Sequence, residues 1–379
     1  MEYLNGTRRQ WLQAAGVGAV TAANTLSPSS GFAKVLPGNV ARPKVEVLAH
    51  RGASALRPEH TLASYAKAIA DGADYIEPDL VMTKDGVLVA RHDNELSSTT
   101  NVAEHPEFSN RRRTEIIDGE QMTGWFVSDF TYREIKTLRA RERIPEIRVN
   151  NAKFDGQFEI PSWEEIIDFV AAQSATVGRQ IGLVPELKHS SYFANIGLSL
   201  EDSFLAIVND HSHTRTAPLI VQSFEVSNLI NLRKKIQNSS NIRLMQLTGA
   251  PKQRPADFVL AKTEITFGDM TSKVGLQIVR TYADIVAPPT RVLVPVDSGQ
   301  RMLAPSRIIS DAHDVGLVVH TWTFRPENRF LAANFRNLDG ENARNETGSI
   351  KEMQFFIALG IDGFFTDDSV LGRRAVDEV

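Results

Sequence analysis

Short apolar runs alternate along the chain with segments of helical periodicity. The runs end in polar residues and lie at 45–50, 73–80, 87–93, 181–188, 217–224, 242–247, 283–289, 317–324 and 361–367. Continuous apolar runs are typical of strands that are buried on both faces, as in parallel sheets. Alternating β and α units over this length predict an α/β fold, a TIM (β/α)8 barrel.

The nine runs are one too many for the eight strands of such a barrel, so we expect one of them to lie outside it or not to be a strand. The connection between the second and third runs, "TKDG" at 83–86, is a turn and not a helix, because Asp-Gly is a strong turn signal. A helix is predicted after the first run, where Thr61 suits the N-cap and apolar residues follow at helical spacing from Leu62 to Ile69.

A polar, irregular segment interrupts the alternation after the third run. We interpret residues 94–160 as a small insertion at the mouth of a barrel that extends over 45–370. The helical pattern resumes with "WEEIIDFVAAQ". The basic run 111–113 inside the insertion could meet an anionic substrate, but short charge runs are usually solvated surface.

Composition narrows the classes of function. The chain has 379 residues, of which 42% are hydrophobic, so it can bury a large core. The net charge of −4 gives no basic excess and argues against nucleic acid as the partner. The absence of cysteine excludes disulfides, thiolate nucleophiles and zinc–thiolate sites. Any metal site must therefore use oxygen or imidazole ligands.

The N-terminal residues 1–33 resemble a twin-arginine export signal. Arg8 and Arg9 precede an apolar, Ala/Gly-rich run, and the small residues Gly31 and Ala33 stand at suitable cleavage positions. The alternative is a basic, amphipathic first helix of the mature fold. Export predicts a periplasmic or otherwise exported protein. No later run approaches the ~20 apolar residues of a membrane span, so we expect no membrane span.

Polar side chains gather where the predicted strands end. They include His50, Arg51, Glu77, Asp79, His92, Asp93, Glu186, Lys188, Gln222, Ser223, His320 and Trp322. In a TIM barrel the carboxyl ends of the strands share one face, and active sites are built there. Each residue alone is explained as a cap, a rim ion pair or a buried packing residue. Their coincidence on successive strands favours a shared site.

The residue types indicate metal-assisted hydrolysis. Glu77, Asp79 and Glu186 provide three oxygen ligands for a hard cation such as Ca²⁺ or Mg²⁺. Without a cation they would repel one another and their pKa values would rise. Histidines from different strands can form a general acid and base pair. Arg51 and Lys188 are suited to binding a phosphate.

The stretch "HRGASALRPEHTLASYAKAIADGADYIEPDLVMTKDGVLVARHD" resembles the signature region of the glycerophosphodiester phosphodiesterase family, and it is most similar to the periplasmic bacterial type. "PELK", "QSF", "HTWT" and "DGFFTD" follow in the order expected for that family. The resemblance implies a TIM barrel of the phospholipase C-like phosphodiesterase type. It implies hydrolysis of small glycerophosphodiesters, such as glycerophosphocholine and glycerophosphoethanolamine, to sn-glycerol 3-phosphate and an alcohol.

The resemblance also implies roles for individual residues. His50 and His92 would be the catalytic acid and base, in an order that the sequence leaves open. A divalent metal, calcium in the periplasmic type with magnesium as the alternative, would be held by Glu77, Asp79 and Glu186. Arg51 and Lys188 would bind the phosphate, and Trp322 would line the glycerol side.

Other polar residues rank lower. His60 is interpreted as a family variant, Glu59 as a further ligand or an orienting group, and His320 as buried packing.

Two alternatives to this function remain open at this point. One is a lipid-directed, phospholipase D-like enzyme on the same barrel, which needs an apolar rim such as "FLAANF" at 330–335. The other is a non-catalytic binding protein on the same fold. The preferred head group, the native metal, the oligomeric state and the cleavage of the signal are not given by the sequence.

Overall fold

The computed structural model describes residues 45–236 and 239–379, so the export segment expected at 1–33 lies outside the described residues. A strand forms in each of the nine apolar runs. The strands of the main sheet are β1 (Glu46–His50), β2 (Tyr75–Glu77), β3 (Asp79–Met82), β4 (Leu88–Ala90), β7 (Gly182–Leu183), β8 (Glu186–Leu187), β9 (Leu219–Ser223), β10 (Ile242–Leu247), β11 (Ile285–Ala287), β12 (Val318–Phe324) and β13 (Gly363–Thr366).

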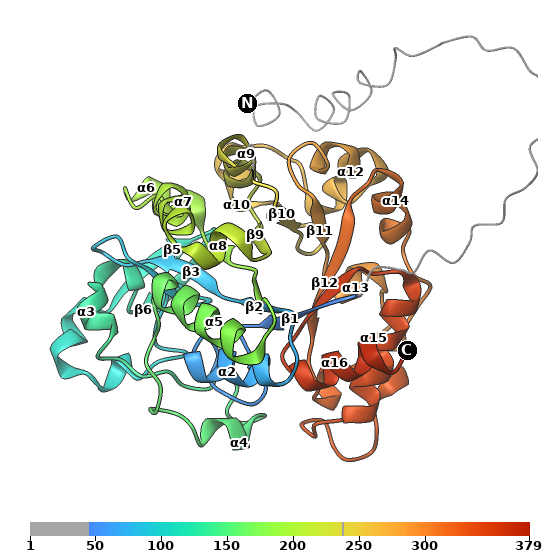
Figure 1. The fold of residues 1–379 in the computed structure, drawn as a ribbon, viewed down its shortest axis with the longest axis horizontal. Helices are drawn as coiled ribbons and strands as arrows, with labels where there is room; N and C mark the ends of the chain where they lie inside the picture. Colours follow the sequence, from blue (N-terminus) through green and yellow to red (C-terminus); the bar gives the residue numbers. More distant parts are fainter. Residues whose placement is uncertain (1–44, 237–238) are drawn as a thin grey trace, which may run out of the picture.

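All of these strands except β4 close into a parallel barrel with eight positions (Figure 1). The consecutive β2 and β3 share one position, interrupted at Pro78, and β7 and β8 share another, interrupted at Pro185. Proline has no backbone N–H for the ladder, which explains both interruptions. From these two positions the ring continues through β9, β10, β11, β12 and β13, and β13 pairs with β1. The prediction of a TIM barrel is confirmed.

The run that lies outside the barrel is the third one. Its strand β4 returns antiparallel beside β3, with Val81 opposite Val89. β3 continues the barrel position of β2 beyond Glu77, and the hairpin then reverses the chain. Arg91 thereby returns to Asp79 at the mouth, where Arg91 N donates to Asp79 O at 2.9 Å. His92 therefore reaches the mouth through a hairpin and not as the end of a barrel strand.

Residues 94–160 follow β4 and so lie between the second and third barrel positions. They contain the hairpin β5 (Arg113–Ile117) and β6 (Glu120–Gly124), helices α3 (Tyr132–Ile135) and α4 (Val149–Ala152), and the 3-10 turns η2 (Val102–Glu104), η3 (Pro106–Arg111) and η4 (Val127–Asp129). Figure 1 shows β5, β6 and α3 together on the side of the barrel that carries β3. In the basic run, Arg111 pairs with Glu134 and Arg113 with Asp129. These pairs support the surface interpretation of that run.

Helices surround the barrel on its outer side (Figure 1). They are α2 (Leu62–Ala70), α5 (Trp163–Val177), α6 (Ser190–Asn195), α7 (Leu200–Asp210), α8 (Ser212–Thr216), α9 (Val226–Lys235), α10 (Ala256–Leu260), α11 (Phe267–Met270), α12 (Lys273–Val279), α13 (Thr290–Leu293), α14 (Ile308–Asp314), α15 (Glu346–Leu359) and α16 (Ser369–Asp377). The loop after β12 holds the turns η5 (Asn328–Phe330) and η6 (Ala333–Phe335). Helix α2 begins as predicted, because the Thr61 side chain accepts from Ser64 N at 3.1 Å.

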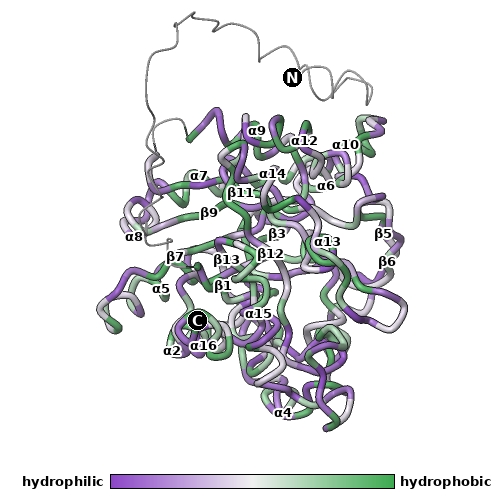
Figure 2. Tube along the Cα trace, turned by 90° about the vertical axis from the view of Figure 1, so that its right-hand side faces the viewer, coloured by the Kyte–Doolittle hydropathy of each residue, from purple (hydrophilic) through white to green (hydrophobic). Residues whose placement is uncertain are grey.

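The apolar core has two parts, as expected for strands buried on both faces. The larger part fills the space between the sheet and the helices. The smaller part includes Leu48, Ile220 and Phe365. Figure 2 shows hydrophobic colour along the central strands, with hydrophilic positions mainly in the outer helices and loops.

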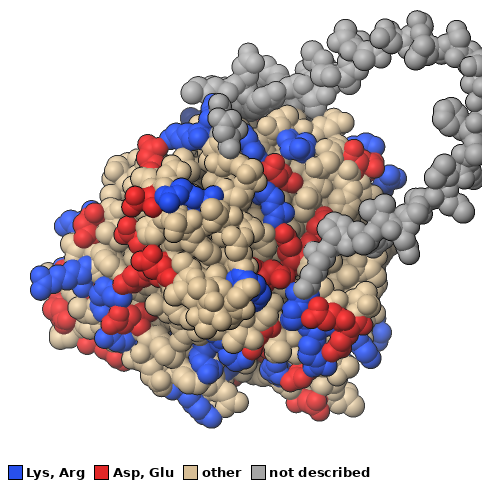
Figure 3. All heavy atoms as spheres, in the orientation of Figure 1, with Lys and Arg blue, Asp and Glu red and all other residues tan. Residues whose placement is uncertain are grey.

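Acidic and basic side chains are interspersed on the face seen in Figure 3, without a large field of one sign. Within 45–236 and 239–379, no helix is both long enough and apolar enough to cross a membrane.

Candidate functional site

Three buried carboxylates meet at the mouth of the barrel. Glu77 ends β2, Asp79 begins β3, and Glu186 begins β8, directly opposite Asp79 in the ladder. One oxygen from each lies within 4.8 Å of the others. The exposed fractions are 1% for Glu77, 1% for Asp79 and 7% for Glu186, so water screens their charges little. The cluster predicted from the strand ends is therefore assembled.

The three carboxylates of this cluster repel one another, and burial strengthens that repulsion. Burial, with the neighbouring Asp79, raises the pKa of Glu77 well above its usual range. Burial also raises the pKa of Glu186 to about 8, against the effect of Lys188. Burial opposes ionisation of Asp79 too, but Lys188 and His60 hold its pKa well below its usual range. A divalent cation would relieve this repulsion, and three hard oxygen donors fit Ca²⁺ or Mg²⁺.

His50, at the end of β1, is held by a carboxylate from the last barrel strand. Its Nδ1 lies 2.6 Å from Asp367 Oδ1, just beyond β13. Burial, with the nearby Arg51, lowers the pKa of His50. A carboxylate on Nδ1 leaves Nε2 as the nitrogen available for proton transfer.

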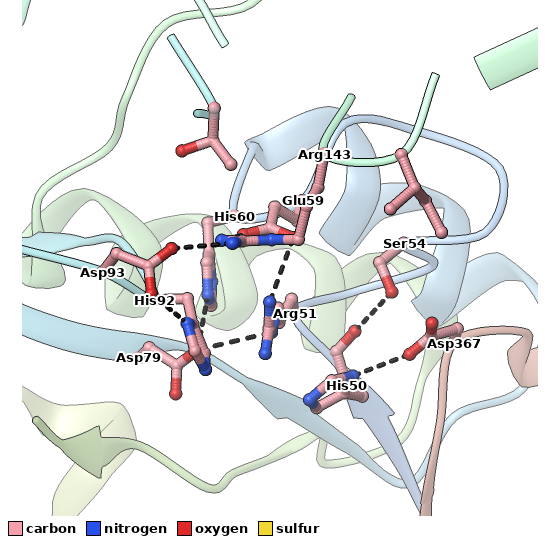
Figure 4. A network of polar contacts seen from close by, with 12 residues as sticks. His50, Arg51, Ser54, Glu59, His60, Asp79, His92, Asp93, Arg143 and Asp367 are labelled. Carbon is pink, nitrogen blue, oxygen red and sulfur yellow. Dashed lines mark hydrogen bonds and ion pairs between the residues drawn. The ribbon is translucent and has the colours of Figure 1, made fainter. Parts of the chain in front are cut away.

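His92 has the same arrangement on the opposite side of the site. Its Nδ1 lies 2.7 Å from Asp93 Oδ1. Burial, with Arg51 and Lys188, lowers the pKa of His92 to about 3. Both pKa shifts favour the neutral imidazole, which is the form that accepts a proton. Figure 4 shows each imidazole against its carboxylate, with Arg51 between them.

Arg51 is placed by a constrained turn. Its φ of 59° is uncommon for a residue with a side chain, and it points Arg51 N at Glu77 Oε2, 2.6 Å away. Gly52 follows with φ 88°, where a Cβ would lie 2.4 Å from Ser64 Oγ. Only glycine suits both the conformation and the space. The buried Arg51 Nε has no hydrogen bond and lies 3.5 Å from Asp79 Oδ2.

A cavity of about 130 Å³ joins these groups. Its lining includes His50, Arg51, Glu77, His92, Glu186, Gln222, Phe224, Leu247, Trp322 and Phe365. Trp322 packs edge-on against Phe224, with 5.6 Å between ring centroids, and its Nε1 donates to Ala287 O. The site therefore has one charged wall and one apolar wall. Among the predicted phosphate-binding residues, Lys188 is set back from the lining, with Nζ 3.1 Å from Glu186 Oε1.

The lower-ranked residues have structural partners. His60 is fully buried, and its Nε2 lies 2.8 Å from Asp79 Oδ2, so it orients that carboxylate. Glu59 faces Arg51 and Arg143 and is not part of the three-carboxylate cluster. His320 is fully buried.

Sequence reasoning missed two arginines that complete the site. Arg143 Nη1 lies 2.7 Å from Asp93 Oδ2, and Arg148 Nη2 lies 2.6 Å from Asp367 Oδ2. Both come from the loop between α3 and α4 in the insertion. Each carboxylate–histidine pair is therefore held by an arginine from residues 94–160. Gln222 was not assigned a role either, although its Nε2 donates to Glu77 Oε1 at 3.1 Å.

Removing Arg148 is expected to destabilise the fold. The side chains of Arg148, Glu327 and Asp367 are exposed by only 7%, 5% and 4%. Arg148→Gln therefore leaves the buried Glu327 without a cation and Asp367 with only the more distant Arg325. We expect a loss of about 3 kcal/mol in the free energy of unfolding, measured by urea denaturation. The control Arg141→Gln breaks a more exposed pair with Glu104 and should cost at most about 1 kcal/mol. Equal losses for the two variants would contradict the importance of this buried network.

Comparison with known proteins agrees with the predicted family and with the fold. Residues 50–371 match the glycerophosphoryl diester phosphodiesterase family. A glycerophosphodiester phosphodiesterase of Arabidopsis thaliana is 32% identical over 336 residues, which cover 84% of this chain and 82% of the relative.

Two solved structures share the fold. A phosphodiesterase from Silicibacter pomeroyi, described as a putative glycerophosphoryl diester phosphodiesterase, superposes with a TM-score of 0.61 at 21% identity, covering 89% of this chain and 94% of the other. A phosphodiesterase of Oleispira antarctica, solved with the product sn-glycerol-3-phosphate, gives a TM-score of 0.57 at 19% identity, covering 88% and 97%. The match over 50–371 and the Arabidopsis relative together show that this chain belongs to the glycerophosphoryl diester phosphodiesterase family.

Proposed function

We propose that this enzyme hydrolyses small glycerophosphodiesters to sn-glycerol 3-phosphate and an alcohol, with a divalent cation and two histidines. The observation that carries the proposal is the single cavity lined by both carboxylate-held imidazoles, by Arg51 and by members of the carboxylate cluster. The product complex of the Oleispira antarctica protein supports the same substrate class.

Glu77, Asp79 and Glu186 would hold the cation, which we propose to be Ca²⁺, with Mg²⁺ as the alternative. When bound, such an ion neutralises charge on the phosphate and polarises it. The guanidinium of Arg51 adds a second positive group at the same end of the cavity. Gln222 steadies Glu77 through its hydrogen bond.

Proton transfer falls to His50 and His92. Nε2 of one imidazole accepts the proton of the attacking hydroxyl as the new P–O bond forms. The other imidazole takes up a proton at Nε2 when the anionic phosphodiester binds beside it, because a nearby negative charge favours the charged form. It donates that proton to the alcohol oxygen as the old P–O bond breaks. The family resemblance favours attack by the substrate's own glycerol hydroxyl, after which water opens the cyclic phosphate. Asp93 and Asp367 fix both imidazoles in one tautomer.

The lipid-directed alternative has less support. Within "FLAANF", Leu331 is 2% exposed and Ala332 is 1% exposed, so the large apolar side chains left for a rim are the half-buried Phe330 and Phe335. We expect the apolar wall around Trp322 to accommodate a short glycerol arm better than a long acyl chain.

The test is a product assay on purified protein. Glycerophosphocholine with Ca²⁺ should yield sn-glycerol 3-phosphate and choline, detected by a coupled glycerol-3-phosphate dehydrogenase assay. Lysophosphatidylcholine should be turned over much more slowly. Release of phosphocholine, or faster turnover of the lysolipid, would refute the proposed bond or the proposed substrate class.

We also propose export through the N-terminal segment. It rests on Arg8 and Arg9 before an apolar run. Replacing both with lysine should leave the protein in the cytoplasmic fraction of a bacterial host, measured by fractionation and immunoblotting. Arg112→Lys, on an exposed residue of the insertion, is the control and should not change export. Normal export of the double variant would rule out the twin-arginine route.

A further inference from the structure

A second cavity adjoins the catalytic one. It encloses about 250 Å³ and shares His50 and Arg51 with the first cavity. Its other walls come from residues 142–148 of the insertion, from 325–330 after β12, and from Glu59 and Asp367. In Figure 4, Arg143, Glu59, Ser54 and Asp367 lie around the side of Arg51 and His50 that faces away from Asp79. The two cavities therefore meet at His50 and Arg51, which would lie on either side of the phosphate.

A phosphodiester has two ester arms that diverge from the phosphorus atom. With its phosphate between His50 and Arg51, one arm points into each cavity. The apolar wall with Trp322 suits the carbon skeleton of glycerol, as proposed above. The second cavity is then left for the alcohol that departs. This assignment rests on the proposed function.

The second cavity is rich in arginine. Arg51, Arg143 and Arg148 line it, but ion pairs to the buried carboxylates Glu59 and Asp367 already engage them. Two further arginines, Arg325 and Arg329, come from the loop after β12.

Arg325 and Arg329 are bound only loosely. Arg325 Nε lies 3.4 Å from Asp367, and its guanidinium lies over the Phe330 ring, 4.9 Å from the centroid. Arg329 Nη2 lies 3.7 Å from the exposed Glu341. Their side chains are 37% and 38% exposed, so both guanidinium groups keep donors for a ligand. Burial also raises the pKa of Glu142 in the same lining to about 7, which reduces the negative charge opposite them.

We infer that this second cavity binds an alcohol arm that carries its own negative charge, a carboxylate or a second phosphate. Arg329 and Arg325 supply charge-assisted hydrogen bonds to that group. A cationic arm such as choline meets like charge there and gains no such bond. The enzyme therefore prefers glycerophosphodiesters with an anionic alcohol.

Two matched substrate pairs test this preference. Glycerophosphoserine and glycerophosphoethanolamine differ by one carboxylate, and glycerophosphoglycerol with and without a terminal phosphate differ by one phosphate. For each pair kcat/KM is measured with saturating metal. We expect the anionic member of at least one pair to be favoured by about tenfold, which is the usual effect of one hydrogen bond to a charged group. The ratio for each pair is kcat/KM of the anionic member divided by kcat/KM of its partner. The pair with the larger ratio shows whether the cavity prefers a carboxylate or a phosphate. Ratios at or below one in both pairs would overturn the inference.

Variants of Arg329 test whether the preference for an anionic alcohol arises in the second cavity. Arg329→Gln should bring the favoured ratio close to one, and Arg329→Glu should invert it. The ratio within one variant cancels any loss of folded enzyme. Arg307→Gln, which removes an arginine with 82% side-chain exposure outside this cavity, is the control and should keep the wild-type ratio. Unchanged ratios in both Arg329 variants would refute the role of this cavity. Failure of all four substrates to yield sn-glycerol 3-phosphate would refute the proposed function instead.

Discussion

His50→Ala and His92→Ala should each lower kcat by about 10²–10⁴-fold, the usual effect of a positioned proton-transfer group. Both imidazoles line the cavity and have a carboxylate on Nδ1, so their Nε2 atoms are the groups lost. KM should change much less, because the lost interaction acts in the transition state. The double variant should be little worse than either single variant. Steady-state kinetics on glycerophosphocholine measure these effects.

The two variants should differ in one further measurement. A substrate with a very acidic leaving group, such as a nitrophenyl ester, needs no protonation of the departing oxygen. It should partly restore the rate of the variant that lacks the acid, and not of the variant that lacks the base. His313→Ala, which removes a 40%-exposed imidazole outside the cavity, is the control and should keep the wild-type rate. Rates close to wild type for both His50→Ala and His92→Ala would mean that these histidines are structural.

Removal of divalent cations should abolish hydrolysis, and Ca²⁺ or Mg²⁺ should restore it. The same ions should stabilise the fold, since a ligand at about 100 times its Kd adds about 2.7 kcal/mol to the free energy of unfolding. Glu77→Gln replaces one of the three clustered carboxylates and should greatly reduce this stabilisation. Thermal unfolding with and without the metal measures the effect without reference to activity.

A matched control is available for this experiment. Glu225 is 3% exposed, and burial raises its pKa to about 8, as for Glu186, but it is not part of the carboxylate cluster. Glu225→Gln should therefore keep the full metal-induced stabilisation. Full activity in excess chelator would exclude a metal mechanism, and equal stabilisation of the Glu77→Gln variant would place the cation elsewhere.

Much of the barrel was predictable because burial leaves a local signal. Each apolar run contains a strand, and the run at 242–247 coincides with β10. The export segment and the role of each site residue stay predictions. The apolar pattern left open which run lies outside the ring, because it is the same for a strand inside the ring and for one folded back beside β3. The local signal for β4 was the turn at 83–86, since parallel neighbours need a longer connection.

The amino-acid sequence was sufficient to place His50, Arg51, Glu77, Asp79 and Glu186 at one end of the barrel. Strand ends are marked by a local change from apolar to polar residues, and parallel strands share one carboxyl face. The partners of these residues required the folded chain. Asp367 is 317 positions from His50, and Arg148 is 219 positions from Asp367, yet each pair is in contact.

A charged residue in an irregular loop has the same local appearance whether it is solvated or buried against a carboxylate. Only closure of the barrel brings β13 beside β1, and only the packing of the insertion places Arg143 and Arg148 on the two carboxylate–histidine pairs. Local patterns record which residues are buried, whereas the pairing of buried charges depends on distances that exist only after the chain has folded.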